Sequence, residues 1–144
     1  SIWTHAYRKP MKGRGQGGIL FVASVVGFTA VPFWSNYAAS KAYDLYLAEA
    51  LAYELKPYGV DVLALCPGTT EAEFQDIAGT KKIRLMPVEK VVSLALYQLG
   101  RKHIAIPGIL NTLNVLSIKL LPRTWSTALF GKVIWHIRKQ ASIF

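Results

Sequence analysis

Three stretches of this chain decide its fold, and they are Gly18-Ile-Leu-Phe-Val-Ala-Ser24, Tyr37-Ala-Ala-Ser-Lys41 and Gly59-Val-Asp-Val-Leu-Ala-Leu-Cys-Pro-Gly68. Residues 19–23 form a continuous apolar run that Ser24 ends, which is typical of a strand buried on both faces. Residues 60–65 predict a second strand, which ends before Pro67. The hydroxyl residue Ser24 therefore follows the first predicted strand, and a turn at Pro67-Gly68 follows the second.

The residues between the two strands predict one long helix. Ser35 or Asn36 can cap its start, and Pro57 ends it. Its apolar residues recur at steps of three and four, as in a helix that packs on a sheet. They are Ala38, Leu45, Ala48, Leu51, Ala52 and Leu55. The order strand, helix, strand indicates an α/β fold with parallel strands and helices over the faces.

The rest of the chain predicts further helices and one short edge strand. Ser1 to Met11 is expected to be the end of a helix, and Glu71 to Met86 a loop or a short helix. Pro87 is expected to open a helix that Gly100 stops. An edge strand over 102–106 and two basic amphipathic helices over 109–121 and 124–140 complete the prediction.

The formal net charge is +9, and most of the excess lies near the end of the chain. Residues 101–144 contain seven Lys or Arg and no Asp or Glu. Such an excess fits phosphate-bearing ligands, anionic lipid or nucleic acid. A second basic group consists of Arg8, Lys9, Lys12 and Arg14. For the first group, in the tail, a solvated face is the favoured interpretation.

The composition of the chain argues against several other classes of protein. No apolar run reaches the roughly 18 residues of a membrane-spanning helix, and no signal peptide is visible. The single cysteine, Cys66, excludes an internal disulfide and fits a reducing compartment, so we expect a cytoplasmic protein, with membrane association as a further option. We expect Cys66 to be a buried apolar residue. His5, His103 and His136 are dispersed, so no metal site is expected.

Tyr37 and Lys41 are four residues apart on the predicted helix, so they share one face. A phenol titrates near about 10, which is too high for proton transfer at neutral pH. A neighbouring ammonium favours the phenolate and lowers the phenol pKa. Ser24 adds a hydroxyl that can donate to a carbonyl oxygen as charge builds there. The sequence leaves open whether this helix begins beside Ser24 and Pro67.

Together the three stretches resemble the short-chain dehydrogenase/reductase family. Its hallmark is a serine thirteen residues before the tyrosine of a Y-x-x-x-K motif, and Ser24 and Tyr37 have this spacing. The resemblance covers about Arg8 to Ile106. It implies that residues 1–108 form the C-terminal half of a Rossmann-type doubly wound parallel sheet, followed by a basic amphipathic helical tail over 109–144.

The resemblance implies hydride transfer between NAD or NADP and a small-molecule carbonyl or alcohol. Tyr37 would be the acid/base, Lys41 would lower its pKa and bind the nicotinamide ribose, and Ser24 would polarise the carbonyl. The positions expected along the cofactor are Tyr37, Lys41, Pro67, Gly68 and Thr70. Ala72 stands where the family commonly has threonine, which removes one expected contact with the cofactor.

The family's glycine-rich pyrophosphate loop, its Asn-Asn-Ala-Gly strand and its catalytic asparagine would all lie before Ser1. The glycines of residues 13–18 precede a predicted strand rather than follow one, so we interpret them as a turn. The chain is therefore expected to be a fragment of a protein roughly twice as long, inactive by itself.

The tail loosely resembles the subset acting on lipid, fatty acyl or steroid carbonyls, so a hydrophobic substrate is expected. Phe28, Phe33 and Trp34 would line its pocket or pack in the core, and Phe74, Ile77 and Met86 would belong to a lid. An apolar stripe of the last helix consists of Trp125, Leu129, Val133 and Ile137. It would cover the cleft, contact another subunit or lie on an anionic membrane, and the first two roles are favoured.

Three alternatives stay open. An epimerase or dehydratase of related fold uses the same Tyr-Lys pair. A non-catalytic nucleotide-sensing or scaffold protein would keep the fold, although the intact Ser24, Tyr37 and Lys41 argue against it. A basic module for membranes or nucleic acid would explain the charge, but nucleic acid is not an expected partner. A homo-oligomer is expected.

Overall fold

The computed structural model describes residues 2–68 and 86–140. At its centre is a parallel sheet with the strand order β1-β2-β3, which confirms the predicted α/β fold. The strands are β1 (Gly17–Val22), β2 (Val60–Leu65) and β3 (Ile104–Ala105). Since the strands are parallel, Val22, Leu65 and Ala105 end at one edge of the sheet.

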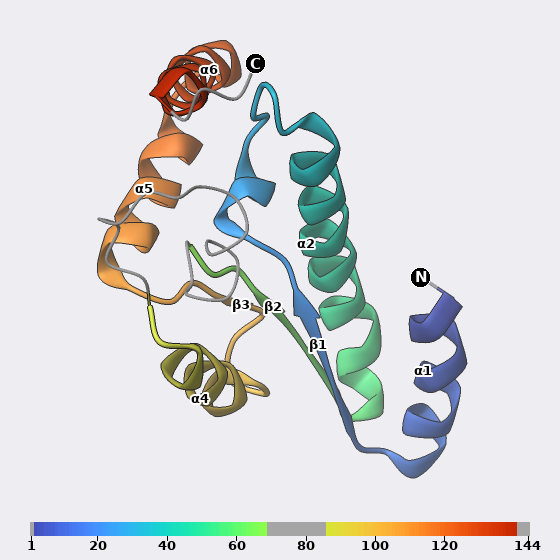
Figure 1. The fold of residues 1–144 in the computed structure, drawn as a ribbon. Helices are drawn as coiled ribbons and strands as arrows, with labels where there is room; N and C mark the ends of the chain where they lie inside the picture. The colour runs from blue at the N-terminus through green and yellow to red at the C-terminus, as the bar shows by residue number, and fades with distance from the viewer. Residues whose placement is uncertain (1, 69–85, 141–144) are drawn as a thin grey trace.

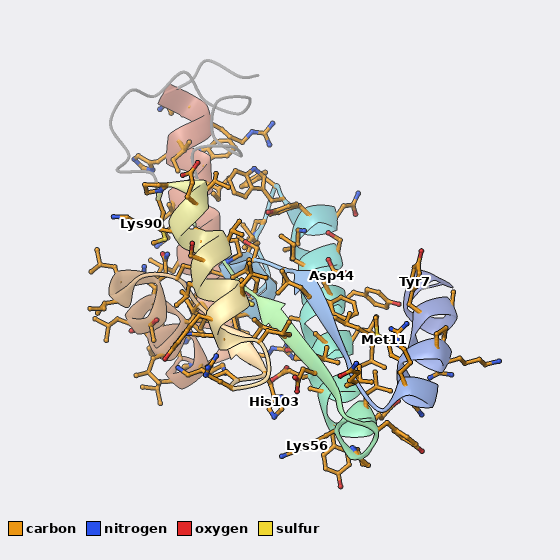
Figure 2. All side chains as sticks on the ribbon, turned by 90° about the horizontal axis from the view of Figure 1, so that it is seen from below. Tyr7, Met11, Asp44, Lys56, Lys90 and His103 are labelled. Carbon is orange, nitrogen blue, oxygen red and sulfur yellow. The ribbon has the colours of Figure 1, made fainter. Side chains whose placement is uncertain are left out.

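Helices cover both faces of the sheet (Figure 1). One face packs on α2, and the other packs on α4, so the strands lie between these two helices in Figure 2. Helices α5 and α6 lie beyond the carboxyl edge of the sheet, and α1 precedes β1. The bounds are α1 (Ile2–Arg14), η1 (Val25–Phe28), α2 (Ser35–Leu55), η2 (Lys56–Tyr58), α4 (Val88–Gln98), α5 (Ile109–Leu120) and α6 (Arg123–Gln140).

Helix α2 packs as its periodicity predicted. All six predicted apolar residues are buried, and most of them join residues of β1 and β2 in the main core. The predicted capping residue is wrong, because Trp34 occupies the N-cap and makes no side-chain capping hydrogen bond. Ser35 and Asn36 are already helical, so neither is in the extended conformation from which a side chain caps a helix.

Strand β1 differs from its prediction, which had both of its faces buried. Its residues alternate between half-buried and exposed, with Leu20 40% and Val22 55% exposed. The alternate residues Ile19 and Phe21 pack on the core under α2. This face of β1 is exposed because, among the described residues, β1 is at the end of the strand order and α4 covers β2 and β3.

The other predicted elements are present with shifted bounds. Helix α4 and the two tail helices, α5 and α6, begin within one residue of their predicted starts, and the edge strand is reduced to β3. Helix α1 continues to Arg14, so the turn comes at Gly15 rather than at Gly13. The predicted segment 71–86 lies outside the described residues except for Met86. Within residues 2–68 and 86–140, no helix is long and apolar enough to cross a membrane.

Gly59 forms the turn into β2 in a left-handed backbone conformation, with φ +66°. A Cβ at this position would lie 2.1 Å from the carbonyl oxygen of Gly15, which is backbone and cannot swing away. The turn that aligns β1 with β2 therefore has room only for glycine.

We predict that Gly59→Ala lowers the free energy of unfolding by about 1–3 kcal/mol, because the side chain adds both left-handed strain and a backbone clash. Urea unfolding of the full-length protein measures this change. Gly13→Ala is the matched control, because a Cβ at Gly13 meets nothing within 4 Å and the residue lies in α1. Equal effects of the two substitutions would contradict the interpretation.

Candidate active site

The ends of β1 and β2 are joined just beyond the sheet by backbone hydrogen bonds. Ala23 N donates to Leu65 O at 2.8 Å, and Val25 N donates to Pro67 O at 3.0 Å. Ser24 lies between these two bonds and is buried. Its hydroxyl accepts from Val26 N at 3.3 Å and donates to Pro67 O at 3.5 Å. The two strand ends therefore place Ser24 against Pro67.

Helix α2 starts at this same edge, which settles the geometry that the sequence left open. The short helix η1 packs directly on α2 at Gly27, where a Cβ would lie 2.8 Å from the carbonyl oxygen of Lys41. Only glycine allows so close an approach without moving α2. The residues of the Y-x-x-x-K motif therefore lie beside the strand ends.

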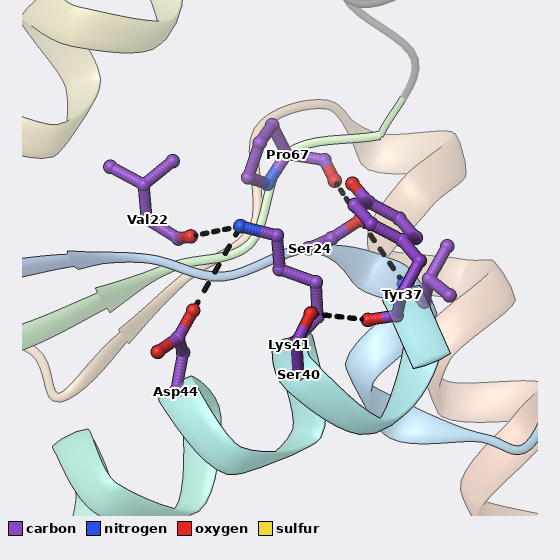
Figure 3. A network of polar contacts seen from close by, with 8 residues as sticks. Val22, Ser24, Tyr37, Ser40, Lys41, Asp44 and Pro67 are labelled. Atoms are coloured by element: carbon purple, nitrogen blue, oxygen red, sulfur yellow. Dashed lines mark hydrogen bonds and ion pairs between the residues drawn. The ribbon is translucent and has the colours of Figure 1, made fainter. Parts of the chain in front are cut away.

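Lys41 is tied to the end of β1. Its Nζ donates to Val22 O at 2.8 Å and lies 3.8 Å from Asp44 Oδ2. Its ammonium also lies 5.8 Å from the centroid of the Tyr37 ring. Figure 3 shows these contacts around the strand end.

Tyr37 lies between Trp34 and Lys41 on the first turns of α2. Its ring meets the Trp34 ring edge-on at a centroid distance of 6.4 Å. In Figure 3 the Tyr37 side chain points toward the loop that carries Ser24 and Pro67. The structure thus brings Ser24, Tyr37 and Lys41 to one edge of the sheet.

Gly68 is buried and contacts a residue that the sequence analysis missed. A Cβ at Gly68 would lie 2.5 Å from the amide group of Asn111, in the first turn of α5. Asn111 Nδ2 donates to Pro107 O at 2.7 Å. No spacing in the sequence indicates this contact, because it depends on where α5 docks. Thr70 lies outside the described residues.

A cavity of about 380 Å³ opens beside this strand edge. One wall contains Val25, Val26 and Gly68, and the other is made by α5 and α6. Apolar side chains predominate, and the polar groups are few. The residues contributed by the helices are Asn111, Asn114, Val115, Ser117, Ile118, Ser126, Leu129, Phe130 and Val133, with Leu121 between them.

The predicted apolar stripe of the last helix divides in the structure. Leu129 and Val133 line the cavity, as the covering role requires, whereas Ile137 packs beside the core residue Ile134 and Trp125 is 67% exposed. The loop aromatics do not line this cavity. Phe28 and Trp34 pack against core clusters, and Phe33 lies 5.8 Å from the Trp135 ring.

Cys66 is fully buried beside Pro67. Burial, and after it the carboxylate of Glu49, raises the pKa of its thiol from 9.0 to about 12. A thiol held neutral at working pH is a poor nucleophile. The prediction that Cys66 is a buried apolar residue is confirmed.

No group of three or more His, Cys, Asp or Glu side chains in residues 2–68 and 86–140 could hold a metal ion. The donor set at the strand edge instead fits the nicotinamide end of a dinucleotide. The Lys41 ammonium has three N–H donors, and Val22 O accepts one of them. Gly13 lies in α1, Gly15 in the turn after it, and Gly17 and Gly18 at the start of β1, on the edge opposite Ser24, so these glycines cannot bind a pyrophosphate beside Ser24.

Comparison with known proteins identifies relatives of this arrangement. The family profile described as short chain dehydrogenase matches residues 2–82. A 7beta-hydroxysteroid dehydrogenase of Clostridium sardiniense is 31% identical over 143 residues, covering 92% of this chain and 52% of that protein. A D-beta-hydroxybutyrate dehydrogenase of Rhizobium meliloti (strain 1021) is 34% identical over 121 residues, covering 69% of this chain and 47% of the relative.

Solved structures agree with the fold. One from a study of 7beta-hydroxysteroid dehydrogenase stereoselectivity superposes with a TM-score of 0.76 at 26% identity, covering 88% of this chain and 50% of the other. A short-chain dehydrogenase from Sphingobium yanoikuyae in complex with NADPH gives a TM-score of 0.61 at 25% identity, covering 83% and 52%. The chain spans about half the length of the curated relatives it matches.

We predict that Cys66 in the native protein reacts with iodoacetamide at least 100-fold more slowly at about pH 9 than in concentrated urea. At that pH about half of ordinary thiols are ionised, but only about one in a thousand with a pKa near 12. Mass spectrometry of the peptide containing Cys66 measures the labelling. Rates within tenfold of each other would show that the thiol is accessible and ionised.

Proposed function

The chain belongs to the short-chain dehydrogenase family, and from this premise we propose that it forms the part of an NAD- or NADP-dependent oxidoreductase that faces the nicotinamide and the substrate. The reaction would be hydride transfer between the cofactor and a carbonyl or alcohol. The observation that carries the proposal is the meeting of Ser24, Tyr37 and Lys41 at one sheet edge, beside an apolar cavity.

Tyr37 acts as the general acid or base in this proposal. Its hydroxyl gives a proton to the substrate oxygen during reduction and takes one during oxidation. The positive charge of Lys41, 5.8 Å from the Tyr37 ring centroid, favours the phenolate and so lowers the cost of releasing the proton. The hydrogen bond from Lys41 to Val22 O holds this charge near Tyr37.

Ser24 binds the substrate oxygen. Its present donation to Pro67 O, at 3.5 Å, is at the long limit of a hydrogen bond, so turning the hydroxyl toward a substrate costs little. The backbone amide of Val26 still fixes the Ser24 oxygen from the other side. Ser24 can therefore donate to the carbonyl oxygen as negative charge develops on it.

Lys41, Pro67 and Gly68 are the described residues that we assign to the cofactor, with Tyr37 beside them. When bound, the nicotinamide ring supplies or accepts the hydride. Lys41 retains N–H donors for a ribose hydroxyl while Val22 O holds its ammonium. The role of Thr70 stays a prediction from the sequence.

The cavity supports a bulky, mostly apolar substrate. Its volume of about 380 Å³ lies within the usual range of small-molecule sites, and its apolar walls favour a ligand with few polar groups. A fatty acyl or alicyclic carbonyl has this chemistry, which agrees with the loose resemblance of the tail. The homo-oligomer and the cytoplasmic location stay predictions.

We predict that Tyr37→Phe in the full-length protein lowers kcat by at least about 100-fold, because proton transfer of this kind contributes roughly 10²–10⁴ in rate. NAD(P)H oxidation with an alicyclic ketone measures turnover, and fluorescence titration should show that cofactor binding changes far less than turnover. Tyr53→Phe is the matched control, since Tyr53 lies on the same helix and is 86% exposed. Turnover of the Tyr37 variant within tenfold of the parent would refute the assigned role.

We predict that Val133→Asn raises KM for a bulky apolar ketone about tenfold and changes kcat little, because an amide on the cavity wall weakens apolar contact with the substrate. Steady-state kinetics measure both constants. Leu96→Asn on α4, at a residue that is 63% exposed and outside the cavity, is the control. An unchanged KM for the Val133 variant would exclude this cavity as the substrate site.

A further inference from the structure

Helix α5 has apolar side chains on two sides. Val115 is buried, and with Ile118 it faces the cavity. Successive steps of four, three and four residues place a second apolar set along another side of the same helix. This set, called here the outer stripe, consists of Ile109, Leu113, Leu116 and Leu120, which are 81%, 52%, 54% and 78% exposed. An ordinary surface helix has one apolar side, so the outer stripe needs a separate explanation.

The outer stripe continues into a basic corner of the fold. Leu121 and Pro122 join α5 to α6, and Trp125 follows in the first turn of α6 with 67% of its surface exposed. Lys119 and Arg123 flank this corner, and both are exposed. After Glu89 the sequence contains no Asp or Glu at all. The apolar surface is therefore accompanied only by positive charge.

This charge pattern decides between two occupants of the outer stripe. A symmetric contact with a second copy would place the same basic segments against each other without any acidic partner from the tail, and like charges across an interface oppose association. An anionic lipid surface supplies the missing negative charge and accepts leucine and tryptophan side chains at the same time. Tryptophan in particular prefers the level of the lipid headgroups.

We propose that the outer stripe and Trp125 dock the protein on an anionic phospholipid surface. The stripe is roughly 16 Å long, so α5 would lie flat along the surface with Leu113 and Leu116 among the acyl chains. Arg123 would meet the lipid phosphates, whereas the Lys119 ammonium lies over the Phe28 ring, 5.0 Å from its centroid. Because the cavity lies on another side of α5, docking leaves it clear, and this surface is independent of the proposed reaction.

Sedimentation with vesicles tests the proposal on the full-length protein. We expect binding to phosphatidylcholine vesicles that contain phosphatidylglycerol, weaker binding at high salt, and little binding to phosphatidylcholine alone. Leu113→Gln with Leu116→Gln should reduce binding to the anionic vesicles at least tenfold. Val92→Gln with Leu96→Gln is the matched control, because these α4 residues have the same kind of spacing and are 47% and 63% exposed.

Arg123→Glu provides a second test that leaves every apolar residue in place. It should also weaken binding to the anionic vesicles and reduce its salt dependence. Absence of binding to anionic vesicles, or equal binding by the stripe variant and the α4 control, would overturn the proposal. Light scattering that shows a dimer lost in the Leu113/Leu116 variant would overturn it too, because the stripe would then be a contact between copies.

Discussion

The backbone hydrogen bonds that continue beyond β1 and β2 hold the candidate site together. They run from Ala23 N to Leu65 O and from Val25 N to Pro67 O, so the two chains stay in register after the strands have ended. Ser24 is fixed between them, and the bond from Lys41 to Val22 O attaches α2 to the same strand end. A slip of one residue in this pairing would turn Ser24 to the other face of the sheet and separate it from Tyr37.

Local pattern was sufficient to predict the elements around this pairing. Helix α2 shows its buried side through steps of three and four residues, and β2 is an apolar run ended by a proline and a glycine. The spacing of Ser24, Tyr37 and Lys41 could be recognised because short segments fix it: one loop joins Ser24 to Tyr37, and one helical turn joins Tyr37 to Lys41. Neither relation requires knowledge of the distant parts of the chain.

Features that depend on how distant helices and strands pack together could not be predicted from local sequence pattern. The exposed side of β1 depends on which helices cover it, and its apolar sequence is the same in either case. Asn111 reaches Gly68 only because α5 returns to the ends of the strands, 43 residues later in the chain. The stripe of α6 had correct periodicity, but periodicity does not say which neighbour each residue meets, and its members face a cavity, a core and solvent.

The tail also acts on the site through the loop before α2. Thr29 of this loop donates to the buried Ser126 of α6 at 3.2 Å, and Ser126 in turn donates to Arg123 O at 2.9 Å. Phe33 has φ 68°, a strained conformation for a bulky residue, and it is held between Trp135 and the Arg138 guanidinium, 5.5 Å from its ring. The next residue, Trp34, is the N-cap of α2 and packs against Tyr37. Contacts from α6 therefore stabilise the strained turn at Phe33, which comes directly before α2 and so helps to fix the position of Tyr37 in the first turn of that helix. The tail is in this way part of the structure that positions the candidate site.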